Sequence, residues 1–173
     1  MKKIAILTAL IGLGSSALWA ADAGPTDPQI AAIVVAANQA DIDAGNLAKS
    51  KSTNASVKEF AQRMVTDHTG VNKAAVDLVT KLKVTPESNP TSQSLAKGGE
   101  DNVAVLKKLS GAAFDKAYVD HEVAYHESVI SAIDKTLIPS AQNAELKALL
   151  VKVRPAFVAH LDHAKKLQGE LSK

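Results

Sequence analysis

The chain has 173 residues, a formal net charge of +2, 46% hydrophobic residues, 3% aromatic residues and no cysteine. This length and hydrophobic content fit one globular domain, and the lack of cysteine excludes disulfide scaffolds, thiolate metal sites and cysteine nucleophiles. Any chemistry must therefore come from histidine and carboxylate side chains, and the abundance of Ala, Leu and Lys favours an all-α fold.

Residues 1–20 have the pattern of a secretory signal peptide. Two lysines precede an apolar run from Ile4 to Leu13, and small residues lead to the expected cleavage site after Ala20. The apolar run is shorter than the ~20 residues that a transmembrane helix needs. We therefore expect export to the periplasm or cell envelope, and a mature domain that spans residues 21–173.

The mature chain should carry no strong net charge. Cleavage after Ala20 removes two lysines and leaves 18 basic and 18 acidic residues. This balance gives no electrostatic support for nucleic-acid binding. No later apolar run is long enough to cross a bilayer, so we expect no transmembrane segment in the mature chain. The sequence does not indicate a protein partner.

Apolar residues at helical spacing predict four long helices in the mature chain. They cover about residues 27–50, 54–85, 112–137 and 140–171. Asp27 is the expected N-cap of the first helix, Pro139 is expected to end the third, and Ser140 is expected to cap the fourth.

The segment between the second and third helices, residues 84–111, contains prolines and glycines. We expect it to form a connection with a weak helical piece rather than a bundle helix. Short links make the first two helices antiparallel, and likewise the last two. A connection this long can travel the length of the bundle. The sequence therefore predicts a ferritin-like four-helix bundle, with the second and third helices parallel.

Few polar residues fall inside the apolar stripes of these helices. The first helix contributes Asp41 and the second contributes His68. The third contributes His126, with Glu122 one turn away, and the fourth contributes His160. Each lies near the middle of its helix, and the midpoints of packed helices meet at one level. We therefore expect these five candidate metal ligands to form a cluster in the core.

Three further polar residues lie beside the stripes. The helical wheels place Asp67 well to one side of its stripe, His121 outward and His163 on the flank of the fourth helix. His163 follows His160 by three residues and could act as an alternate ligand.

The cluster has two interpretations. Burying three histidines and two carboxylates costs more than burying apolar side chains, which favours a metal site, and these ligand types suit iron, manganese, zinc or copper. Alternatively, the cluster is a polar network that fixes the helix register or lines a ligand pocket. No Gly-rich phosphate loop or G-x-S-x-G motif is present, so no organic cofactor is expected, and the sequence does not decide whether the protein is an enzyme.

The segments "NQADIDAGNLAKSKS", "VKEFAQRMVTDHT", "LSGAAFDKAYVDHEVAYH" and "LIPSAQNAELKALL" resemble a bacterial family of exported proteins of unknown function. Its members are often labelled predicted outer membrane proteins and described as ferritin-like. The resemblance covers nearly all of the mature chain, and it implies a cell-envelope location and a four-helix fold without an established activity. His68, Glu122, His126 and His160 match its recurring polar positions, whereas Asp41 stands where glutamate is more usual.

These observations support two functional hypotheses. The first is an exported ferritin-like protein that binds a transition metal in the bundle core and serves redox chemistry, metal handling or stress protection. The second is a non-enzymatic envelope protein that binds a partner or small ligand and contains a structural network of buried histidines and carboxylates.

Overall fold

The computed structural model describes residues 24–173, and every regular element in this range is helical. The elements are α1 (Asp27–Lys51), α2 (Ala55–Leu82), α3 (Pro90–Lys107), α4 (Gly111–Ala132), the π-helical turn η1 (Ile133–Leu137), α5 (Ile138–Ser140) and α6 (Ala144–Leu171). The all-α prediction is therefore confirmed. The predicted signal peptide lies outside the described residues.

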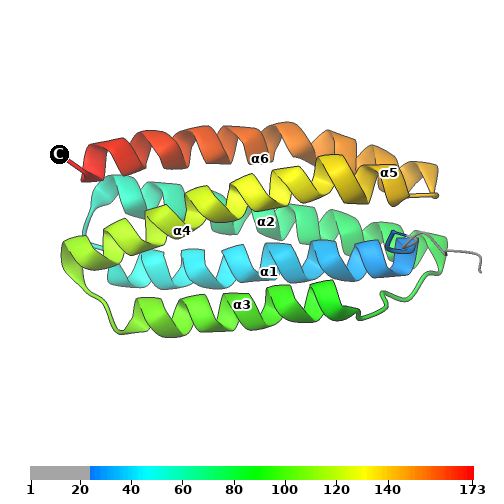
Figure 1. Cartoon of the computed structure of the whole chain (residues 1–173), viewed down its shortest axis with the longest axis horizontal. Helices are drawn as coiled ribbons and strands as arrows, with labels where there is room; N and C mark the ends of the chain where they lie inside the picture. Colours follow the sequence, from blue (N-terminus) through cyan, green and yellow to red (C-terminus); the bar gives the residue numbers. More distant parts are fainter. Residues whose placement is uncertain (1–23) are drawn as a thin grey trace, which may run out of the picture.

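The long helices lie side by side along one axis of the molecule (Figure 1). α1 and α2 form one antiparallel pair, α4 and α6 form another, and α2 also packs against α6. α3 runs the length of the bundle along α1 and returns the chain to the opposite end, so α2 and α4 run in the same direction (Figure 1). Within residues 24–173, no helix combines the length and apolar character that a bilayer-spanning helix needs.

The expectation of a mere connection over residues 84–111 is wrong, because α3 is a full helix packed against α1. Asn89 and Ser92 form a capping box that starts it. A Cβ atom at Gly99 would lie 2.8 Å from the Cβ of Ala40. Glycine lowers the helix propensity of this segment, but at Gly99 it also lets the two helix backbones approach closely.

Two predicted helix starts differ from the structure. Thr26, rather than Asp27, caps α1 through its side-chain oxygen. The Asp27 carboxylate instead accepts 2.9 Å hydrogen bonds from the backbone N–H groups of Gln142 and Asn143, which ties the loop before α6 to the beginning of α1. Asn143, rather than Ser140, caps α6.

The third predicted helix also ends later than expected. α4, η1 and α5 follow one another without a break as far as Ser140, and Pro139 lies within the first turn of α5. Proline has no N–H group for the hydrogen bonds of a helix interior, and the helical segment ends one residue after Pro139.

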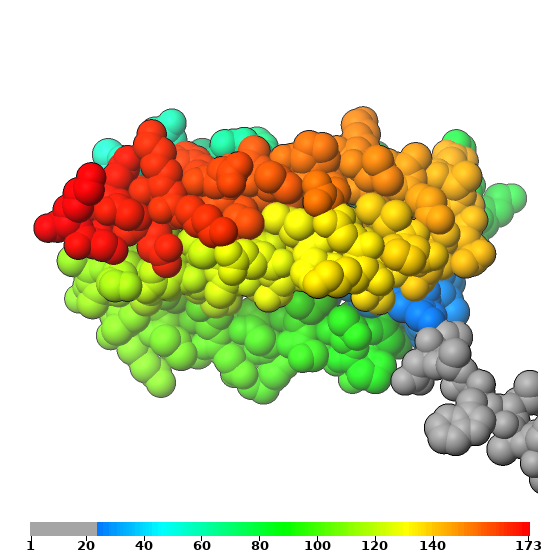
Figure 2. Space-filling model, turned by 45° about the horizontal axis from the view of Figure 1, so that its top comes forward, coloured from blue at the N-terminus to red at the C-terminus, as the bar shows by residue number. Residues whose placement is uncertain are grey.

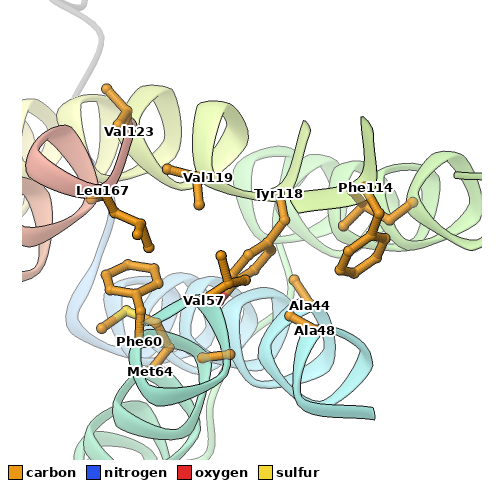
Figure 3. Packing of buried hydrophobic residues seen from close by; sticks show 13 residues of the cluster. Ala44, Ala48, Val57, Phe60, Met64, Phe114, Tyr118, Val119, Val123 and Leu167 are labelled. Atoms are coloured by element: carbon orange, nitrogen blue, oxygen red, sulfur yellow. The ribbon is translucent and has the colours of Figure 1, made fainter. Parts of the chain in front are cut away.

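The apolar core consists of two clusters. Side chains from α1, α2, α3, α4 and α6 meet in the first (Figure 3), which we call the Phe60 cluster. Its members are Ala44, Ala48, Val57, Phe60, Ala61, Met64, Leu106, Phe114, Tyr118, Val119, Val123, Ala164 and Leu167. The second, the Ile133 cluster, contains Ile30, Ile33, Ile133, Leu137, Ala141, Leu146, Leu150 and Phe157.

Candidate metal centre

A layer of polar side chains separates the two apolar clusters at the middle of the bundle. On α1, for example, Asp41 lies between Ile33 of the Ile133 cluster and Ala44 of the Phe60 cluster. On α6, His160 lies between Phe157 and Ala164 in the same way. The side chains of this layer are buried, and surroundings of low dielectric constant strengthen the electrostatic interactions among them.

The structure brings the five candidate residues together in this layer. The exposed fractions are 3% for Asp41, 2% for His68, 0% for Glu122, 1% for His126 and 0% for His160. They come from α1, α2, α4 and α6.

Two overlapping groups of ligand atoms are present. One ring nitrogen each from His68, His126 and His160 lie within 4.8 Å of one another, and one ligand atom each from Asp41, Glu122 and His126 meet the same limit. Zinc holds nitrogen and oxygen ligands at about 2.0–2.2 Å, so the ligands of one such ion lie within about 4 Å of one another. Small side-chain shifts would therefore allow these residues to hold an ion.

The tautomer of His68 follows from its neighbour Asn38. The side-chain N–H of Asn38 donates a 2.9 Å hydrogen bond to the carbonyl oxygen of Val34, which turns the amide oxygen of Asn38 toward the ring. This oxygen lies 2.7 Å from Nδ1 of His68. Because an amide oxygen only accepts hydrogen bonds, Nδ1 carries the proton, and Nε2 of His68 keeps its lone pair.

The other two rings are held in the same manner. Nδ1 of His126 donates a 3.0 Å hydrogen bond to the backbone carbonyl oxygen of Glu122, which leaves the lone pair on Nε2. Nε2 of His160 donates a 2.8 Å hydrogen bond to Oδ2 of Asp67, which leaves the lone pair on Nδ1.

Each histidine thus has one nitrogen held by a neighbour and one buried nitrogen without a partner. The unpartnered atoms are Nε2 of His68, Nε2 of His126 and Nδ1 of His160. Metal-binding histidines typically donate the other ring N–H to a carboxylate, a backbone carbonyl or another acceptor, which orients the ring and fixes the tautomer. All three rings in this layer show that arrangement.

The two carboxyl groups of the layer are unusual acids. Burial raises the pKa of Asp41 above its ordinary value. The pKa of Glu122 is raised well above its ordinary value by burial and by the charge of Asp41. Oδ1 of Asp41 and both carboxyl oxygens of Glu122 lack hydrogen-bond partners. A cation in the layer would stabilise both groups in the ionised form.

The histidines are unprotonated near neutral pH. Burial lowers the pKa of His126 to about 4. The pKa of His68 is lowered well below its ordinary value by burial and by the neighbouring His126 and His160. Burial also lowers the pKa of His160, although Asp67 opposes the shift. Neutral imidazole is the form that binds metals.

A family model matches residues 15–167, which is most of the chain, and its description is "Domain of unknown function (DUF4142)". The chain belongs to this family. No curated protein and no solved structure matches the chain. Membership of the DUF4142 family supplies no activity, so the function has to be argued from the geometry of the centre.

The helical wheels do not assign three further residues to this centre. Asn38 precedes Asp41 by three residues, and Tyr118 precedes Glu122 by four, so both lie one turn from a predicted ligand. Burial and the nearby carboxyl groups raise the pKa of Tyr118, so the phenol stays protonated. Asp67 does lie to one side, with 38% of its side chain exposed, yet it reaches His160.

The two remaining histidines lie outside the cluster. The prediction that His121 points outward is wrong in part, because its ring is half-buried and stacks on Tyr125 at a centroid distance of 5.4 Å. Burial lowers the pKa of His121. His163 is also half-buried and packs edge-on against Phe60 at 5.1 Å, so neither ring belongs to the two ligand groups.

Proposed function

We propose that the protein binds one transition-metal ion between α1, α2, α4 and α6. His68, His126 and His160 supply nitrogen ligands, and Asp41 and Glu122 supply carboxylate oxygen. The observation that carries the proposal is the set of three buried, unpartnered ring nitrogens, each on a ring whose other nitrogen is hydrogen-bonded. Leaving such atoms without a partner in the core costs free energy. One metal ion would accept the lone pairs of all three nitrogens and remove this cost.

The donor set narrows the choice of metal. Three imidazoles with one or two carboxylates suit iron, copper and zinc, whereas manganese prefers mainly carboxylate and water ligands. A di-iron centre of the four-helix type uses a Glu-x-x-His motif on each of two helices. This chain offers only Glu122 and His126, four residues apart on α4, so a single ion fits the residues better.

The proposed biological role follows from the predicted export and the bundle. We propose a ferritin-like protein of the periplasm or cell envelope that uses the ion for metal handling, redox chemistry or protection against stress. The parallel course of α2 and α4 (Figure 1) and the position of the polar layer between the two apolar clusters support the ferritin-like assignment. Intact mass of the protein from the periplasm should show loss of residues 1–20, and retention of this segment would contradict the export proposal.

The alternative is an envelope protein with a structural polar network. A structural network is expected to pair its buried polar atoms with one another. Here one nitrogen of each ring, Oδ1 of Asp41 and both carboxyl oxygens of Glu122 lack hydrogen-bond partners, which favours the metal proposal.

Metal titration separates the two proposals. Purified protein is stripped with a chelator and titrated with Fe²⁺, Mn²⁺, Zn²⁺ and Cu²⁺ while the melting temperature and the bound metal are measured. We expect one equivalent of at least one ion and a higher melting temperature, because an ion that binds only the native state stabilises it. The variants His68→Gln and His160→Gln should lose the bound ion.

His163→Gln serves as the matched control. It changes the same residue type on α6, three residues from His160, without removing a ligand. This variant should keep the stoichiometry and the thermal shift of the parent. A melting temperature that no metal changes would leave the structural network as the better explanation.

A further inference from the structure

A second feature of the molecule is a cavity of about 940 Å³ at the end of the bundle where α1 and α6 begin. We call it the end cavity. Its walls consist mainly of aliphatic side chains from α1, α2, α3, α4, η1 and α6. These are Ile33, Val34, Val71, Leu95, Val129, Ile133, Leu137, Leu149, Leu150 and Val153. Sites for organic molecules have volumes of roughly 300–1,000 Å³, so the end cavity can take an organic molecule rather than only water or a gas.

The end cavity leads from the surface to the polar layer. Its exposed lining residues include Thr91, Ser128 and Thr136, which form the rim. In Figure 2, α3 and α4 cover α1 except near its first turns, which come to the surface between the beginning of α3 and the end of α4. At the inner end, Asp41 and His68 form the floor.

The floor is the part of the end cavity where polar atoms need a partner. Nε2 of His68 and Oδ1 of Asp41 are buried and have no hydrogen-bond partner, and both residues are at most 3% exposed. The nearest carboxyl oxygen, Oδ2 of Asp41, lies 3.5 Å from Nε2 of His68. A hydroxyl group between these residues could donate its proton to either atom.

The charges of the lining restrict the occupant. Asp41 is the one acidic residue among the residues that line the end cavity in the described part of the chain, and none of them is lysine or arginine. A carboxylate or phosphate would therefore be buried beside an acid without a cation to pair it, which is strongly unfavourable. The aliphatic walls likewise disfavour sugars and other polar molecules.

We propose that the end cavity binds an apolar organic molecule with a single uncharged hydroxyl group. The apolar body packs against the aliphatic walls, and the hydroxyl group reaches Asp41 and His68 on the floor. Burial of the apolar body drives binding, because it removes apolar surface from water. The proposal goes beyond metal binding, because the walls and the hydrogen bonds to the floor act without an ion.

A series of ligands with one chain and different head groups tests this inference. Metal-free protein is titrated calorimetrically with 1-decanol and with decanoate at neutral pH. We expect 1-decanol to bind and decanoate to bind at least about tenfold more weakly, because its charge is buried without a partner. Absence of 1-decanol binding, or equal binding of both compounds, would overturn the proposal.

Two substitutions of valine test the location. Val34 is half-buried in the wall of the end cavity, so Val34→Trp places an indole ring inside the cavity. Val76→Trp places the same ring on the surface of α2, where the valine is 50% exposed. We expect only Val34→Trp to weaken 1-decanol binding, by about tenfold or more. Leu149→Trp, on the α6 wall of the end cavity, provides a second filling variant if Val34→Trp does not fold. Unchanged affinity in a folded filling variant would refute the location.

The 1-decanol titration of metal-free protein and the metal titration are independent measurements, so together they separate this inference from the proposed function. If 1-decanol binds but no metal does, the end cavity is a ligand site and the metal proposal fails alone. If metal binds but 1-decanol does not, the metal proposal stands and this inference is wrong.

Discussion

Asp67 reaches the buried ring of His160 from the surface of α2, and Oδ2 of its carboxylate accepts a 2.8 Å hydrogen bond from Nε2. The histidine is fully buried, whereas 38% of the Asp67 side chain is exposed. The hydrogen bond between Asp67 and His160 therefore connects the polar layer with solvent. It also leaves Nδ1, rather than Nε2, of His160 as the nitrogen with a free lone pair.

Asp67→Asn should weaken metal binding by about tenfold or more, because a neutral amide is a poorer acceptor and holds the ring less firmly. Asp77→Asn is the matched control. Asp77 pairs with Lys73 four residues earlier on α2, as Asp67 pairs with Arg63. Metal affinity is measured by competition with a chelator. Equal affinities for the two variants would show that Asp67 does not support a ligand.

Asn38→Leu should also reduce metal affinity, by roughly 10–100-fold, because it removes the acceptor that fixes the His68 tautomer. The exposed neighbour Gln39, which contacts only Asp43 in its side-chain hydrogen bond, provides the control Gln39→Leu. Nitrogen NMR of the metal-free protein should show a mixture of His68 tautomers in Asn38→Leu. A single unchanged tautomer would contradict this role of Asn38.

Much of this centre could be predicted from helical periodicity. Asp41, His68, His126 and His160 interrupt apolar stripes near the middle of long helices, and packing at one level brings them together whatever the helix directions. Periodicity does not report the reach of a side chain, however. Asp67 lies off the stripe of α2, yet its carboxylate extends to a ring on α6.

The course of α3 could not be predicted for a different reason. Gly98 and Gly99 lower helix propensity, so the local sequence suggests a weak helix. The compensating contact with Ala40 involves a residue far away in the sequence, and only the packed structure shows it. The starts of α1 and α6 were misplaced because several Asn, Ser, Thr and Asp residues near each start can act as caps.

Gly99→Ala should lower the melting temperature, because the new Cβ would meet the Cβ of Ala40 at 2.8 Å and push α3 away from α1. Gly98→Ala is an unusually close control, since a Cβ at that position has no neighbour within 4 Å. It should stabilise the protein by roughly 0.5–1 kcal/mol through helix propensity. Thermal unfolding gives the melting temperatures of both variants. If both melting temperatures change in the same direction, the close packing of Gly99 is contradicted.

His126 should make the metal-free protein less stable in acid. The unfolded chain binds a proton on this ring below pH ~6.5, whereas burial lowers the pKa of the folded ring to about 4. Between these values only the unfolded state is protonated, so the free energy of unfolding falls as the pH falls, by about 3 kcal/mol in all. Above this range the ring contributes no pH dependence.

His126→Gln isolates this effect from the carboxyl groups. Asp41 and Glu122 have raised pKa values in the folded state, so their contribution changes in the opposite direction as the pH falls. Urea unfolding of both proteins at several pH values gives the difference between them. The parent should lose more stability than His126→Gln on acidification from pH ~6.5 to ~4, and parallel curves would refute the lowered pKa.

Metal binding should release protons from the two carboxyl groups. Burial raises the pKa of Asp41 and, together with the charge of Asp41, that of Glu122. Near neutral pH the metal-free layer therefore retains a carboxyl proton, which a bound cation would expel. Affinity should consequently increase as the pH rises through the range in which the pair ionises. Calorimetric titration in two buffers of different ionisation enthalpy counts the released protons.

Asp41→Asn provides the decisive comparison, because an amide has no proton to release and carries no charge that raises the pKa of Glu122. This variant should release fewer protons than the parent and show a weaker dependence of affinity on pH. Asp43→Asn changes an exposed carboxylate two residues away and should behave like the parent. Equal proton release from the parent and Asp41→Asn would mean that Asp41 is already ionised in the metal-free protein. Asp41 would then not contribute to the pH dependence of metal binding.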